Sequence, residues 1–207
     1  TYHMLLFIDV VSPLSEFSVI EDNNLILNKK INENSKERLS DNIISAYQNI
    51  ESKINLSEKL DKIAITAGPG SYTALRVGSA FAAGLCISKK IMCYSFSITD
   101  LIKFNLKKAK NKNLGVYIVS ANNQKFFCKM NKLNKIEYIK IENENYKVSD
   151  DIETIIYNFK KLDNQLNHIE QLKFSFTKEI ISNYNNLNFE NNTIIKPVYV
   201  SNNIILN

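Results

Sequence analysis

The stretch with the greatest potential for chemistry is a glycine-rich turn, Gly68-Pro69-Gly70-Ser71-Tyr72-Thr73. It follows the apolar run 63–66 and precedes a long apolar segment, which is the order of a strand, a turn and a helix. Free N–H groups at the start of a helix can bind a phosphate group. A Walker A loop would need Gly-Lys-Ser or Gly-Lys-Thr after the turn, and none follows here. The pattern therefore favours a structural turn over a weak phosphate site, either role being carried by Gly68, Pro69, Gly70, Ser71 and Thr73.

Side chains that could bind a metal ion are few. Asp9 follows the apolar run 5–8, and a carboxylate at the end of a strand could bind Mg²⁺. Its neighbours Val10 and Val11 offer neither a glycine nor a hydroxyl for a phosphate group. The two histidines, His3 and His168, have no second histidine at i+4 that would share a helix face and a metal ion. We therefore predict no catalytic residue and no metal ligand in this chain.

Cysteine content and charge restrict the class of protein further. Cys86, Cys93 and Cys128 are odd in number and form no CxxC pair, which argues against a disulfide framework and a zinc site. The apolar start 4–11 is short and contains a carboxylate, so neither a signal peptide nor a membrane span is expected. A reducing cytoplasm fits both observations. The net charge of +5 permits contact with RNA without requiring it.

The order of predicted elements repeats along the chain: three strands, a helix, a strand and a helix. Mixed sheets flanked by helices, in two copies of one α/β unit, would produce this order. We therefore expect a first domain over 1–109 and a second over 110–207. The predicted strands are 5–8, 17–20, 25–31, 63–66, 91–95, 114–120, 125–130, 136–141 and 172–176, and the predicted helices are 37–50, 71–87, 99–109, 149–161 and 178–186.

The predicted helix 71–87 is apolar on all sides, with Arg76 as its only charge. Ser71 or Thr73 is expected to cap its first turn. A helix that is apolar all round is buried all round, yet its own sheet can cover only one face. Either the preceding helix or a partner chain must cover the other. The residues predicted for a partner interface are Leu39, Ile43, Tyr47 and Ile50 on the preceding helix, with Arg76, Val77, Ala80, Ala83, Gly84 and Ile87 on this one.

These residues also carry a family resemblance. The run Gly68–Gly78, followed by Ala83-Gly84-Leu85, resembles the signature of the TsaB (YeaZ-like) family. The resemblance is close over about residues 5–101 and patchy beyond, where Lys196–Val200 with Asn202-Asn203 resembles the family's C-terminal segment.

The resemblance implies the fold, the function and the partners. The family has the actin-like ATPase (ASKHA) architecture of two RNase H-like halves, here with partner-binding helices in the first and a shortened, degenerate second. It implies a non-catalytic subunit that binds and supports a TsaD-type catalytic subunit in threonylcarbamoylation of adenosine next to the anticodon of tRNAs. The two N-terminal helices of each subunit would pack as a four-helix bundle. ATP and metal are expected on the partner, and tRNA is expected to bind only through the complex. A TsaE-type ATPase, and a homodimer of the chain alone, are further partners that the resemblance allows.

The chain also departs from the family pattern. It has Asp9-Val10-Val11 where Asp-Thr-Ser or Asp-Thr-Ala is frequent, Ser120-Ala121-Asn122 where Asp-Ala-Arg is frequent, and Ser201 in place of an arginine. The region before Lys196 is shorter than usual and is expected to lack a helix. The catalytic paralogue has a His-x-x-x-His pair on its first long helix, and the segment 37–50 contains no histidine. Two other functions stay open: an ATP-dependent enzyme of actin-like fold and a peptidase of the glycoprotease family.

Overall fold

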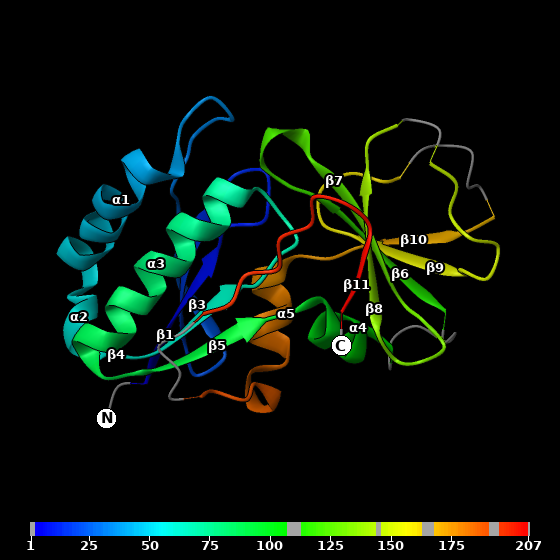
Figure 1. Ribbon diagram of the computed structural model, residues 1–207. Helices are drawn as coiled ribbons and strands as arrows, with labels where there is room; N and C mark the ends of the chain where they lie inside the picture. Colours follow the sequence, from blue (N-terminus) through cyan, green and yellow to red (C-terminus); the bar gives the residue numbers. More distant parts are fainter. Residues whose placement is uncertain (1–2, 107–112, 144–145, 163–167, 191–194, 207) are drawn as a thin grey trace.

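Two mixed β-sheets lie side by side in the computed structural model, which describes residues 3–106, 113–143, 146–162, 168–190 and 195–206 (Figure 1). The first sheet has the strand order β3-β2-β1-β4-β5, in which β1 pairs antiparallel with β2 and parallel with β4. Asp22 and Asn23 adopt positive φ in the turn between β2 and β3. The strands are β1 (Met4–Asp9), β2 (Glu16–Glu21), β3 (Asn24–Lys30), β4 (Leu60–Thr66) and β5 (Met92–Phe96).

The helices of the first half agree with the predicted positions, except that one short helix was not predicted. It is α2 (Leu56–Lys59), one turn long, which follows a left-handed cap residue, Asn55. The end of the predicted helix 99–109 lies outside the described residues, as does the predicted boundary between residues 109 and 110. The other three helices are α1 (Leu39–Ile54), α3 (Tyr72–Lys89) and α4 (Ile98–Leu106).

The second sheet repeats the arrangement of the first. Its order is β10-β9-β6-β7-β8-β11, and β6 pairs antiparallel with β7 and parallel with β9, as β1 does with β2 and β4. The predicted duplicated RNase H-like α/β fold is therefore confirmed. Its strands are β6 (Leu114–Val119), β7 (Lys125–Met130), β8 (Ile136–Ile141), β9 (Thr154–Tyr157), β10 (Glu170–Lys173) and β11 (Ile204–Leu206).

The predicted helix 149–161 is wrong, because this segment contains β9. The run Thr154-Ile155-Ile156-Tyr157 consists of β-branched and aromatic residues, which favour a strand, and it lies buried between β6 and β10. The predicted strand 172–176 begins earlier, at Glu170, and ends at Lys173. The predicted helix 178–186 consists of α5 (Phe176–Ser182) and a short 3₁₀ turn, Tyr184–Asn186.

Each of the two helices between the sheets packs on the sheet of the other half of the chain. Figure 1 shows α4 and α5 there, where α4 contacts β6 and β7 of the second sheet and α5 contacts β1 of the first. The two helices also touch each other, since Asn105 Nδ2 donates a hydrogen bond to Glu179 Oε2 at 3.3 Å. Each half of the chain thus supplies a helix that covers the other half's sheet.

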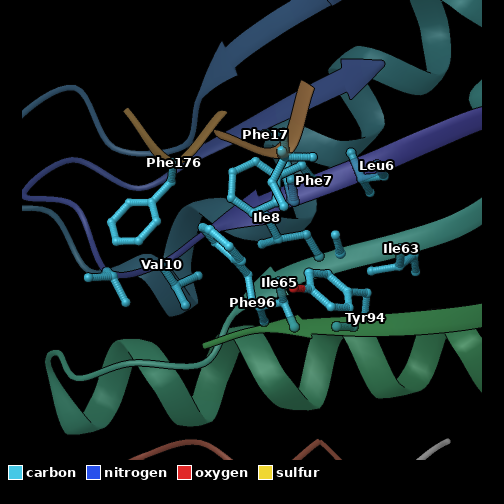
Figure 2. Packing of buried hydrophobic residues seen from close by; sticks show 14 of the residues in the cluster. Leu6, Phe7, Ile8, Val10, Phe17, Ile63, Ile65, Tyr94, Phe96 and Phe176 are labelled. Atoms are coloured by element: carbon cyan, nitrogen blue, oxygen red, sulfur yellow. The ribbon is translucent and has the colours of Figure 1, made fainter. Parts of the chain in front are cut away.

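One hydrophobic core runs through both sheets as a result. It includes β1, all of whose residues are buried, and Val116 and Ile118 of β6. Figure 2 shows this packing, with side chains of β1, β4 and β5 and Phe176 of α5 in the same cluster. Tyr117 and Val119 belong to a second, smaller cluster, because alternate residues of β6 point to opposite faces. No helix in the described part of the chain combines the length and the apolar character needed to cross a lipid bilayer.

Candidate functional site

The glycine-rich turn links β4 to α3 and is packed against the chain's own C-terminal segment. The Val198 N–H donates a hydrogen bond to the Ala67 carbonyl at 2.7 Å. Gly68 has a φ of +112°, and a Cβ on it would lie 2.6 Å from the Val198 carbonyl oxygen. Figure 1 shows this segment, in red, running past the start of α3 towards the second sheet. The space beside Gly68 is filled by protein, which supports the interpretation as a structural turn.

The start of α3 is capped differently from the prediction. Ser71 occupies the N-cap position and is buried, but its side chain makes no capping hydrogen bond. Its carbonyl instead accepts the hydrogen bond from the Leu75 N–H at 2.9 Å. Thr73 lies exposed in the first turn. The predicted side-chain cap by Ser71 is therefore wrong.

Asp9 uses its carboxylate within its own turn. Its Oδ1 accepts hydrogen bonds from the backbone N–H groups of Val11 and Ser12, each at 3.0 Å, and its Oδ2 accepts one from the Ser12 hydroxyl. The side chain is buried, and desolvation raises the pKa of the carboxyl to about 6, although the bonds from Ser12 oppose this shift. These bonds close the connection after β1.

We expect Asp9→Asn to remove a pH-dependent contribution to the free energy of unfolding. The folded-state pKa of about 6 lies above the usual pKa of an aspartate, 3.8, so folding favours the protonated carboxyl. Its stabilising contribution is complete below about pH 4 and is lost as the pH rises through about 6, an effect of at most about 3 kcal/mol. Urea unfolding at several pH values should show this decline in the parent chain and a flatter profile in the variant. Equal slopes for the two chains would contradict it.

The described residues do not fit the metal site of the catalytic paralogue. They contain no group of three or more His, Cys, Asp and Glu side chains that could hold a metal ion. His3 Nδ1 instead pairs with Asp61 Oδ2 at 3.0 Å on the surface, and His168 lies exposed in the second half of the chain. No step that depends on a metal ion can be derived from this part of the chain.

Two cavities of about 410 Å³ lie away from the glycine-rich turn. One lies between α4 and the second sheet and is lined mainly by apolar side chains such as Ile102 and Met130. The other lies beside β5 and is lined by Tyr94, Asp100 and Lys196, among others. Asp100 accepts hydrogen bonds from the backbone N–H and the hydroxyl of Ser97, so it stabilises the start of α4.

The residues predicted for the partner interface fall into two groups in the structure. On α1, Leu39, Ile43 and Ile50 are buried in the chain's own core, and Tyr47 is half-buried. The α1 stripe therefore stabilises this chain's own fold. On α3 the residues face outwards: Arg76, Ala80, Gly84 and Ile87 are exposed, and Val77 and Ala83 are partly exposed.

We call Arg76, Ala80, Ala83, Gly84 and Ile87 the α3 outer face. Their spacing of three or four residues places them on one side of the helix. A Cβ on Gly84 would meet nothing within 4 Å, and Ile87 is 61% exposed. The opposite side is tightly packed, because a Cβ on Gly78 would lie 2.6 Å from Val10 Cγ1. The described part of the chain thus leaves the outer face uncovered.

An aromatic pair beside Arg76 was not predicted from the sequence. The rings of Tyr72 and Tyr199 lie 4.7 Å apart, and the Arg76 guanidinium lies 5.4 Å from the centre of the Tyr72 ring. Tyr72 precedes Arg76 by four residues, so helical spacing could have placed the two together. The contact with Tyr199 joins distant parts of the sequence and has no such signal. No ion pair between Arg76 and a carboxylate is found within the described residues.

A second aromatic cluster joins α1 to α3. The Tyr47 ring lies 5.5 Å from Phe81 and 6.4 Å from Phe17. The Tyr47 hydroxyl is buried and has no hydrogen-bond partner among the described residues. Burial, followed by the charge of Glu51, raises the pKa of this hydroxyl, which keeps it neutral.

The chain is similar to known proteins in its sequence family and in its fold. A family model described as "TsaD: tRNA N6-adenosine threonylcarbamoyltransferase" matches residues 26–196. A solved structure of an uncharacterized protein with similarity to peptidase YEAZ from Pseudomonas aeruginosa has a TM-score of 0.62 at 12% identity, covering 96% of this chain and 99% of that chain. The structure of YeaZ from Pseudomonas aeruginosa has a TM-score of 0.56 at 12% identity, covering 96% and 100%. No curated protein sequence matches the chain.

Proposed function

Since the chain belongs to the TsaD (tRNA N6-adenosine threonylcarbamoyltransferase) family and has a YeaZ-like fold, we propose that it is a non-catalytic, TsaB-type subunit. Its partner in this proposal is a TsaD-type catalytic subunit. The reaction that the pair supports is threonylcarbamoylation of adenosine next to the anticodon of tRNAs, in the cytoplasm. ATP and metal are assigned to the partner, tRNA binds only through the complex, and a TsaE-type ATPase is a further partner.

The state of the two candidate chemical sites supports a non-catalytic role. The carboxylate of Asp9 accepts three hydrogen bonds within its own turn, and Val198 fills the space beside Gly68. At both sites the Asp9 carboxylate and the space beside Gly68 are thus taken up by contacts within the described part of the chain. The alternatives, an ATP-dependent enzyme and a peptidase, would each need a group aimed at a phosphate or a metal ion.

The single observation that carries the proposal is the uncovered α3 outer face. Exposed apolar helix surface is typical of a protein-binding site. Ala80, Ala83 and Gly84 are small, so the backbone of a second helix can approach closely, as helix packing at 8–10 Å requires. On α1, Ile44 is 54% exposed, whereas the predicted stripe is buried. In the proposed helix bundle α1 therefore contributes its outward side chains.

We expect Gly84→Leu to weaken binding of the TsaD-type protein from the same organism by at least about 100-fold, because the leucine occupies the space of the partner helix. The melting temperature should stay close to that of the parent, since the new side chain points into open space. Binding can be measured by titration calorimetry and folding by thermal melting.

Two variants control this experiment. Gly84→Ala adds one methyl group and should raise stability by about 0.5–1 kcal/mol while weakening binding far less. Lys103→Leu places the same leucine on an exposed position of α4 and should leave binding unchanged. If Gly84→Leu binds as tightly as the parent, the interface is wrong. ATP turnover by the pure chain would favour the ATP-dependent enzyme instead, and a homodimer that Gly84→Leu separates would place self-association on the same face.

A further inference from the structure

The structure brings two cysteines together between α3 and β5. On β5, Tyr94 packs on Phe189, and Phe96 packs on Phe104 of α4 and Phe176 of α5. Neighbouring residues of a strand point to opposite faces of the sheet. Cys93 directly precedes Tyr94 in β5, so it points to the opposite face of the sheet, on which α3 packs.

Cys86 approaches the same place from the helix. It lies on the buried side of α3, one turn after Ala82, and is only 2% exposed. Its carbonyl accepts a hydrogen bond from the Ile91 N–H at 3.2 Å, so the chain turns back tightly and enters β5 with Cys93 two residues later. Both thiols are free. The interaction between the two thiols lowers the pKa of Cys86 and raises that of Cys93, which burial raises further.

We infer that Cys86 and Cys93 form a dithiol that hydrogen peroxide converts into an intramolecular disulfide. The Cys86 thiolate attacks one peroxide oxygen, so an S–O bond forms, the O–O bond breaks and hydroxide leaves as water. The Cys93 sulfur then attacks the Cys86 sulfur, so an S–S bond forms and the sulfenic hydroxyl leaves as a second water with the proton from Cys93. Two thiols lose two electrons, and one peroxide becomes two waters.

Cys128 offers an internal control within the same chain. It lies on β7 in the second sheet and is fully buried, and this burial raises the pKa of its thiol. Since the thiolate is the reactive form, Cys128 should oxidise at least about tenfold more slowly than Cys86. The inference is independent of the proposed function, because it uses the inner side of α3 and not the α3 outer face.

The test treats the purified, folded full chain with hydrogen peroxide and maps its peptides by mass spectrometry without reduction. We expect a disulfide between Cys86 and Cys93, a free Cys128, and full reversal by dithiothreitol. In Cys93→Ser, which lacks the resolving thiol, Cys86 should instead accumulate as a sulfenic acid that a cyclic dione captures. A folded parent chain that oxidises Cys128 as fast as Cys86, or that forms no Cys86–Cys93 disulfide, would overturn the inference. The parent experiment decides this outcome even if the variant does not fold.

Discussion

Gly68→Ala is expected to lower the free energy of unfolding by about 4 kcal/mol. The backbone at Gly68 has a φ of +112°, a conformation that residues with a Cβ rarely adopt. The new methyl group would also lie 2.6 Å from the Val198 carbonyl oxygen, which is a backbone atom and cannot turn away. The backbone strain and the steric clash act together, so the melting temperature should fall by about 10 °C or more.

Gly70→Ala is the matched control, two residues away in the same turn. A Cβ there would lie 3.4 Å from Val11 Cγ2, an ordinary contact with a side chain, so the expected cost is below about 1 kcal/mol. Hydrogen exchange gives a second measurement. In Gly68→Ala the Val198 N–H should lose protection, because its hydrogen bond to Ala67 depends on close approach to the turn. A Gly68→Ala chain that melts like the parent and keeps this protection would show that the C-terminal segment does not lie against Gly68.

Phe96→Ala is expected to cost about 3–5 kcal/mol of stability. Phe96 is 1% exposed, and its ring centre lies 5.9 Å from that of Phe104 on α4 and 5.9 Å from that of Phe176 on α5. Each of these two helices packs on the sheet of the other half of the chain. Removal of the ring therefore leaves a cavity at the junction of the two halves, which urea unfolding should report as a lower midpoint.

Phe159→Ala separates this effect from the general loss of an aromatic ring. Phe159 is 52% exposed, so its replacement should change stability by less than about 0.5 kcal/mol. Phe96→Leu should fall between the two variants, because it keeps most of the apolar volume. If Phe96→Ala and Phe159→Ala unfold at the same midpoint, the core does not run through both halves at this residue.

Local patterns in the amino-acid sequence predicted most of the secondary structure and the family. The apolar runs of β1 and β4 and the 3.6-residue stripe of α1 are local patterns, and the structure has these elements where they were predicted. The turn after β4 was also evident, because Pro69 fixes its own φ and the glycines on either side allow turn dihedrals that other residues avoid. The run Gly68–Gly78 supported the family resemblance, which the match over residues 26–196 confirms.

Which side of a helix is covered was decided only by the tertiary structure. Periodicity shows that a face is apolar, but it does not show what lies against that face. The α1 stripe and the α3 outer face looked alike in the sequence. In the structure Ile43 is buried in the chain's own core, whereas Gly84 faces open space.

The long-range contacts were likewise invisible in the sequence. The Val198 N–H donates a hydrogen bond to the Ala67 carbonyl, and the Tyr199 ring packs against Tyr72, although each pair is more than 120 residues apart. The strand β9 was mistaken for a helix because short apolar runs fit both periods, and its place between β6 and β10 resolves that ambiguity. The packing of α4 and α5, each on the sheet of the other half, is also a long-range feature that local patterns do not show. Propensity and spacing act over a few residues, whereas these features depend on the energy of packing segments that meet only after the chain has folded.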